Sequence, residues 1–164
     1  MIEPIIGFSV FLTLVILFIR NSNNSLEKEY NLIVEGLNDN VKLFIEQARC
    51  SNSTFGINNR NYLFKNCDLH LTNDALIIFG YTKKSFFKQL SKPIILTKEI
   101  SKYKTYFPFA IVANLEDIVY SSSDKYVFVK FGEVGLTKTR VKFKIEISSE
   151  SDKDKMKLIT DDFK

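Results

Sequence analysis

Hydrophobic residues follow three patterns along the chain, and the first is an unbroken apolar run. Residues 5–19 contain no charged side chain, and their only polar side chains are Ser9 and Thr13. Helices in the cores of soluble domains instead show polar residues recurring along one face. The run is slightly shorter than the ~20 residues that cross a ~30 Å hydrocarbon layer, but Arg20 can reach the headgroups from its end. We expect residues 1–20 to form a transmembrane anchor.

Two alternatives stand beside the anchor. A secretory signal peptide carries a positive segment before its apolar run and a small-residue cleavage site after it. Here Glu3 is the only charged residue before the run, and the sequence RNSNNS follows it. The second alternative is a helix packed against protein, which would be amphipathic. The anchor is favoured because the run lacks the features that each alternative requires.

The second pattern has helical spacing. Apolar residues recur every three or four positions over residues 26–49, which predicts an amphipathic helix there. Asn24 and Glu27 resemble a capping box at its start. Gly36 and residues 38–40 could instead turn a hairpin. We expect the apolar face to pack on the chain's own domain, with a coiled coil or a partner protein as the alternative.

The third pattern has a period of two, which is typical of antiparallel strands with one buried face. It predicts a hairpin that turns at Asn73 and Asp74, preceded by a loop over residues 50–61 and followed by a basic loop over residues 82–92. Two or three short strands are expected between residues 101 and 124. The remaining strands are expected over residues 93–100, 125–131 and 139–147.

The last predicted strand alternates most regularly. Its apolar residues are expected to face inward, and Arg140, Lys142 and Lys144 to face outward. Helical spacing returns over residues 149–163, where Ser151 and Asp154 resemble a capping box. The chain is therefore expected to end in one helix after a series of strands.

About seven short strands followed by one helix resemble the PH-like (pleckstrin-homology-like) superfold, and in particular bacterial PH-like domains tethered to membranes. Residues 61–164 carry the resemblance, and the segment CDLHLTNDALIIFG is similar to the opening hairpin of those domains. The resemblance implies an α+β fold in which a mainly antiparallel, partly open barrel of about seven strands is capped by the C-terminal helix. It also implies a non-enzymatic binding module. The expected organisation is an anchor over residues 1–20, a linker and amphipathic helix over residues 21–60, and the PH-like domain over residues 61–164.

Basic residues are concentrated in the middle of the chain. Residues 81–145 contain thirteen Lys or Arg and five Asp or Glu, against a net charge of +4 for the whole chain. The resemblance implies that basic residues near the first hairpin and its following loop bind anionic headgroups, and each Lys near an anionic bilayer contributes about 1 kcal/mol. The candidate residues for binding lipid or a protein partner are Lys83, Lys84, Phe86, Phe87 and Lys88 in the loop, and Arg140, Lys142 and Lys144 on the last strand.

Residue types that serve catalysis or metal binding are scarce. His70 is the only histidine, and Cys50 and Cys67 form no C-x-x-C pair, so a zinc site lacks ligands. His70 and Cys67 would face opposite sides of a strand. No nucleophile elbow, Walker loop or dinucleotide fingerprint occurs in the sequence. We therefore predict no enzymatic activity, no metal and no cofactor, and the two cysteines are either one disulfide or two free thiols.

The expected function is that of a single-pass, membrane-anchored binding module which presents its PH-like domain at the membrane face. Arg20 and Lys28 follow the apolar run and no Lys or Arg precedes it, which favours the cytoplasmic side for the domain. The expected partners are the lipid bilayer and a protein. Nucleic acid is not expected, because Arg is sparse and no RNA-binding motif is present. The alternative is a structural subunit of a membrane or envelope complex, assembled through the anchor and the helix over residues 26–49.

Overall fold

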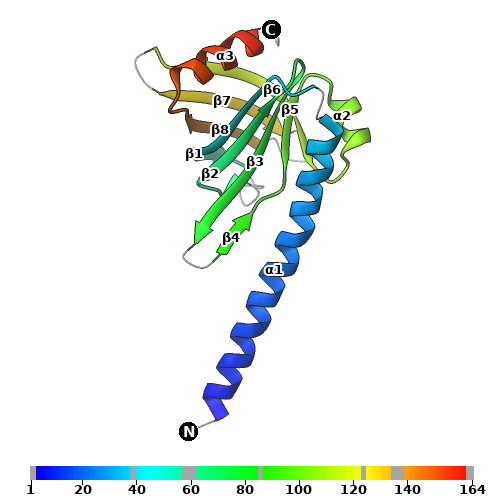
Figure 1. Ribbon diagram of the computed structural model, residues 1–164, viewed down its shortest axis with the longest axis vertical. Coiled ribbons are helices and arrows are strands. Elements are labelled where there is room, and N and C mark those ends of the chain that lie inside the picture. The colour runs from blue at the N-terminus through cyan, green and yellow to red at the C-terminus, as the bar shows by residue number, and fades with distance from the viewer. Residues whose placement is uncertain are drawn as a thin grey trace.

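The computed structural model describes residues 3–37, 40–56, 62–84, 87–122, 125–133 and 139–161. A long N-terminal helix runs along one side of a β-barrel and continues well beyond it, while the C-terminal helix lies at the opposite end of the molecule (Figure 1). In chain order the elements are α1 (Glu3–Leu37), β1 (Leu43–Phe55), β2 (Asn66–Leu71), β3 (Ala75–Lys84), β4 (Phe87–Leu90), β5 (Ile94–Thr97), α2 (Ile100–Tyr106), β6 (Ile111–Tyr120), β7 (Tyr126–Glu133), β8 (Thr139–Glu146) and α3 (Glu150–Asp161).

Seven of the strands form a closed ring. Its order is β1, β2, β3, β5, β6, β7 and β8, and β8 pairs with β1 to close it. Every pairing is antiparallel except that of β5 with β6, which is parallel, with α2 in the crossover between them. The strands are therefore mixed, and the barrel closes where a partly open one was expected. A seven-stranded barrel with a C-terminal helix is compatible with a PH-like fold.

The fourth strand extends the barrel wall. β5 pairs with the first half of β3, where Ile78 faces Ile94, and β4 pairs with the second half, where Tyr81 faces Leu90. The basic loop predicted over residues 82–92 is therefore wrong, because most of this segment forms the β3–β4 hairpin. Lys-rich sequence is compatible with such a strand because charged side chains are tolerated at the edge of a sheet.

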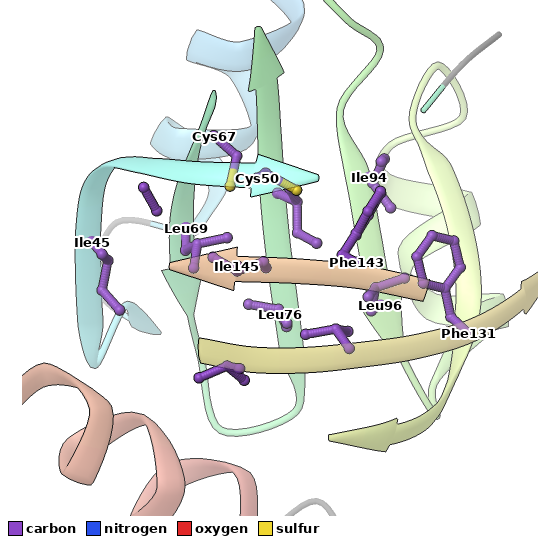
Figure 2. Packing of buried hydrophobic residues seen from close by; sticks show 14 of the residues in the cluster. Ile45, Cys50, Cys67, Leu69, Leu76, Ile94, Leu96, Phe131, Phe143 and Ile145 are labelled. Atoms are coloured by element: carbon purple, nitrogen blue, oxygen red, sulfur yellow. The ribbon is translucent and has the colours of Figure 1, made fainter. Parts of the chain in front are cut away.

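Inward-facing side chains fill the barrel. Residues such as Leu69 on β2 and Phe143 on β8 are completely buried (Figure 2). The ring of Phe143 packs against the Phe131 ring with centroids 5.3 Å apart, and against the Phe64 ring at 5.2 Å. The Phe64 ring occupies the place where a side chain at residue 80 would begin, so only glycine fits at Gly80. The interior is thus a tightly packed core.

A second apolar core lies outside the barrel. Ile33 and Leu37 of α1 are buried against the outer faces of β3 and β5, and α2 closes the other side. This confirms the expectation that the apolar face of the helix after residue 26 packs on the chain's own domain. The buried residues of this cluster are Ile33, Leu37, Ala75, Ile77, Phe79, Ile95, Tyr103, Phe107 and Val112.

α1 is one continuous helix, and three predictions for the segment from residue 24 to residue 55 are wrong. Asn24 lies within α1, so it caps no second helix. The helix predicted over residues 26–49 ends at Leu37, and the strand β1 begins at Leu43. β1 continues to Phe55, so the first part of the loop predicted over residues 50–61 is a strand. Residues 57–61 of that loop lie outside the described residues. No helix among the described residues is long and apolar enough to cross a membrane.

A β-bulge gives part of β1 the residue spacing of a helix. Gln47 has a φ of 55° and the strand register shifts between Ile45 and Ala48. Inward-facing residues of a regular strand are two positions apart, but the bulge inserts one more residue. The resulting three-residue step reproduces the spacing of a helix.

The C-terminal half follows the predictions more closely. β5, β6, β7, β8 and α3 form where strands and a final helix were expected, although β6 is a single strand. The first of the short strands expected between residues 101 and 124 is wrong, because α2 forms there with Ile100, Tyr103 and Phe107 on one face. The cap of α3 lies two residues before the proposed capping box, since Asp152 N donates to Ser149 Oγ at 3.2 Å.

Candidate binding surfaces

The first group of predicted site residues lies on the β3–β4 hairpin. Lys83 and Lys88 face each other across the two strands, and both are exposed. The Lys88 ammonium lies 3.8 Å from the centroid of the Tyr81 ring, a cation–π contact. Lys83 Nζ donates to Gln47 Oε1 at 3.0 Å, so the bulge of β1 supports this side of the hairpin. The two ammonium groups are thus held next to one another on one surface.

The hairpin is joined to α1 by hydrogen bonds between one side chain of α1 and the main chain of β4. The Asn23 side chain donates to the carbonyl oxygen of Lys88 and accepts from the Leu90 N–H at 3.1 Å. Lys84 and Phe87 are the last paired residues before the hairpin turn, and Phe86 lies outside the described residues. β3 and β4 extend out of the barrel on the side where the N-terminal half of α1 lies (Figure 1).

The Tyr30 hydroxyl makes a second connection between α1 and the hairpin. It donates to two carbonyl oxygens, that of Ser91 at 2.6 Å and that of Gly80 at 3.0 Å. Burial raises the pKa of Tyr30, so the hydroxyl keeps its proton at neutral pH. Asn23 and Tyr30 together determine which side of α1 faces the barrel.

The second group of predicted residues lies on the outer face of β8. Arg140, Lys142 and Lys144 are exposed, while the residues between them are buried, as the alternation predicted. Lys142 lies over the Phe128 ring at 4.5 Å and Lys144 over the Tyr126 ring at 3.8 Å. The rings of β7 therefore support the aliphatic stems of two of the three cations.

The two groups are not brought together. β8 is separated from β3 by β1 and β2 in one direction, and by β7, β6 and β5 in the other. α1 packs on the outer face of β3 and β5, and so on the side away from β8. The structure thus presents two distinct basic surfaces, which we call the hairpin surface and the β8 surface.

The neighbours of the β8 surface include residues that the sequence did not indicate. Phe55, which fell in a predicted loop, is 83% exposed and pairs with Arg140. Lys130 lies beside Lys142 on β7 and forms an ion pair with Asp117 at 2.9 Å. A shallow cavity of about 280 Å³ opens here, lined by Ser53, Phe55, Glu116, Lys130, Arg140, Val141 and Lys142. Only the strand register brings these side chains together, because they come from four separate strands.

A larger cavity, of about 620 Å³, lies between the end of α1, the β2–β3 turn and α2. Asp74 is central to its wall. Its carboxylate accepts from the Tyr103 hydroxyl at 2.8 Å and the Thr72 hydroxyl at 2.9 Å, and pairs with Lys102 at 2.6 Å. Burial would raise the pKa of Asp74, but these hydrogen bonds together hold it below its ordinary value. The sequence indicated Asp74 as a turn residue, and gave no signal that α2 would bring Tyr103 to it.

Protonation states in the Asp74 cluster favour a structural role. Burial, and then the bond to Asp74, raise the pKa of Tyr103 to about 12. At neutral pH Tyr103 therefore keeps its proton while Asp74 is ionised, so both groups stay in the forms that their hydrogen bond requires. The cluster holds the β2–β3 turn against α2.

His70 and Cys67 lie on opposite sides of the barrel wall, as their spacing predicted. Cys50 and Cys67 are free thiols in the core, and His70 stacks on the outside between Phe44 and Phe79. The hydrogen bond with Cys50, and burial, raise the pKa of the Cys67 thiol. Burial lowers the pKa of His70. Among the described residues, no group of three or more His, Cys, Asp or Glu could hold a metal ion.

Comparisons with known proteins add no functional assignment. No family model, curated protein or solved structure matches the chain. The architecture alone is compatible with a PH-like fold, and the functional argument therefore depends on the two basic surfaces and on α1.

Proposed function

We propose that this chain is a non-enzymatic, membrane-anchored binding module whose PH-like barrel is held at an anionic membrane surface. The observation that carries the proposal is the N-terminal half of α1. Beyond the barrel its large apolar side chains are exposed, namely Phe8, Val10, Phe11, Leu12, Leu14, Val15, Ile16, Leu17 and Phe18. An exposed apolar surface of this extent is typical of a segment that another apolar phase covers.

Lipid is the covering that best fits this segment. The exposed side chains lie all around the helix rather than along one stripe, and a partner helix would cover only one stripe. At 1.5 Å per residue, residues 7–19 reach about 20 Å into a hydrocarbon layer. Arg20 and Lys28 follow on exposed turns, where they can meet headgroups. The Lys and Arg bias favours the cytoplasmic face for the barrel.

The hairpin surface supports the same orientation. Asn23 bonds the hairpin to α1 only three residues after Arg20, so Lys83 and Lys88 lie near the end of the apolar segment. In this orientation each exposed lysine contributes about 1 kcal/mol of attraction to an anionic leaflet. The alternative role, a structural subunit assembled through residues 26–49, is less favoured because the chain's own barrel covers Ile33 and Leu37.

Two charged substitutions in the apolar segment test the anchor. We expect the full chain to stay in the membrane pellet after an alkaline wash, and Leu14→Lys/Leu17→Lys to move mainly to the supernatant, because buried lysines oppose insertion by several kcal/mol. Leu32→Lys/Leu158→Lys is the matched control, since both leucines are exposed elsewhere. The anchor is disproved if wild type is washed off, or if the control is released equally. A reporter fused after Lys164 identifies the side of the membrane.

The hairpin surface is tested in the background of that double variant, where insertion no longer dominates binding. We expect residual binding to phosphatidylserine vesicles to exceed binding to phosphatidylcholine vesicles. Adding Lys83→Gln/Lys88→Gln should then weaken it about tenfold or more. Lys155→Gln/Lys157→Gln removes the same charge from α3 and should change binding less than twofold. Equal recovery with both lipids would exclude a headgroup contact at the hairpin.

A further inference from the structure

We infer that the β8 surface is a docking site for an extended acidic segment of a partner protein. The surface consists of Arg140, Lys142 and Lys144 on β8 with Phe55 of β1 at one end. It does not depend on the membrane contact proposed above, because α1 and the hairpin lie on other strands of the barrel.

The three cations form no ion pair among the described residues, although Glu146 is close enough to Lys144 to interact with it electrostatically. Two of the carboxylates that flank the row pair with other lysines instead. Glu146 pairs with Lys125, and Asp117 pairs with Lys130. Glu116 lines the cavity at the Arg140 end and is the one carboxylate there with no ion pair among the described residues. The surface therefore presents a positive row whose charges an incoming group can satisfy.

The spacing of the row matches an extended polypeptide. Arg140, Lys142 and Lys144 are alternate residues of one strand, so their Cα atoms are about 7 Å apart. Side chains on one side of an extended peptide repeat at the same distance, so carboxylates at alternate positions can meet all three cations. The supporting rings of Phe128 and Tyr126 hold two of the ammonium groups in place. This limits the side-chain entropy that binding removes.

The aromatic residues favour a peptide over single-stranded nucleic acid. Proteins that bind single strands stack successive bases on free aromatic rings. Here Lys142 and Lys144 already lie on the rings of Phe128 and Tyr126. Only Phe55 is widely exposed beside the row. One free ring can cover an apolar side chain next to an acidic segment, but cannot provide a stacking path for several bases.

The experiment measures the binding of a fluorescein-labelled nonapeptide of alternating Glu and Ser to the full chain in neutral detergent, by fluorescence anisotropy. We expect Arg140→Gln/Lys142→Gln/Lys144→Gln to weaken binding about tenfold or more, as expected when three charge pairs are lost. The matched control is Lys104→Gln/Lys155→Gln/Lys157→Gln, which removes three exposed positive charges from α2 and α3 and should change Kd less than twofold. A peptide with Gln in place of Glu should not bind measurably.

Three outcomes would overturn the inference. They are equal weakening by the control variant, unchanged binding by the β8 variant, and tighter binding of an oligothymidylate of equal charge, which would identify a nucleic-acid surface instead. Because no anionic lipid is present, failure here leaves the membrane proposal intact. Peptide binding is measured without a membrane, so failure of the anchor test would not affect this result.

Discussion

The two halves of α1 differ in apolar content and have opposite surroundings. In residues 7–19 the large apolar side chains are exposed around the helix, whereas in the second half Ile33 and Leu37 are buried against the barrel and α2. The helix itself is continuous across the boundary. The difference therefore comes from what covers each half, and not from helix formation.

The comparison shows how one helix can serve two environments. A helix that packs on a barrel needs one apolar stripe, and the second half of α1 has charged residues such as Glu27, Lys28 and Glu35 around its buried stripe. The first half has no such polar face. A barrel surface can cover a stripe, but only a surrounding apolar phase covers a whole circumference.

The largest effect should come from truncating the covered half. Ile33 is completely buried, so Ile33→Ala should lower the free energy of unfolding of the chain in neutral detergent by about 2–5 kcal/mol. Leu17→Ala, in the exposed half, should change it by less than about 0.5 kcal/mol. Urea titration followed by circular dichroism measures both. Equal losses in the free energy of unfolding would show that Ile33 is no better covered by protein than Leu17.

α2 helps to bury the second half of α1, and a substitution of Asp74 tests which contacts hold α2 in place. Asp74→Asn weakens the ion pair with Lys102 and the bond from Tyr103, so we expect about 1–3 kcal/mol of lost stability at pH 7. The folded-state pKa of Asp74 lies below its ordinary value. Its stabilising contribution is therefore present above about pH 4 and is lost as the pH falls through the folded-state pKa.

The difference in unfolding free energy between wild type and Asp74→Asn should accordingly shrink as the pH falls from 5 to 2.5. Glu27→Gln is the control, because Glu27 is exposed on α1 and forms no hydrogen bond or ion pair among the described residues. A constant difference between wild type and Asp74→Asn across this pH range would exclude the ionised carboxylate as the source of the stability.

The sequence predicted those elements whose hydrophobic period is regular. β8 and the β2–β3 hairpin alternate without interruption, so the strands, the inward residues and the outward cations were all found. β1 was missed because the bulge at Gln47 gives its inward residues a helical spacing. α2 is not predicted because it is short: the helical spacing of Ile100, Tyr103 and Phe107 covers only two turns, and their packing against the second core favours the helix.

The same limit applies to the binding surfaces. Individual cations could be identified from the sequence because charged residues within an alternating strand must face solvent. Their neighbours could not, because Phe55 and Lys130 join Arg140 and Lys142 only through the register of separate strands. Closure of the barrel also determines that the hairpin and β8 surfaces lie apart.

The smallest effect should come from Asn23, the first residue of the covered half that contacts the barrel. Asn23→Ala removes the two hydrogen bonds to β4, which contribute about 0.5–1.5 kcal/mol each, but gains about 0.5 kcal/mol of helix propensity. We expect a net loss of about 1 kcal/mol, with faster amide hydrogen exchange at Leu90. Asn24→Ala has the same propensity gain without a bond to lose, and should be stabilised by about 0.5 kcal/mol. If both variants were stabilised equally, the Asn23 bonds would contribute nothing, and the covered half would begin only at Tyr30.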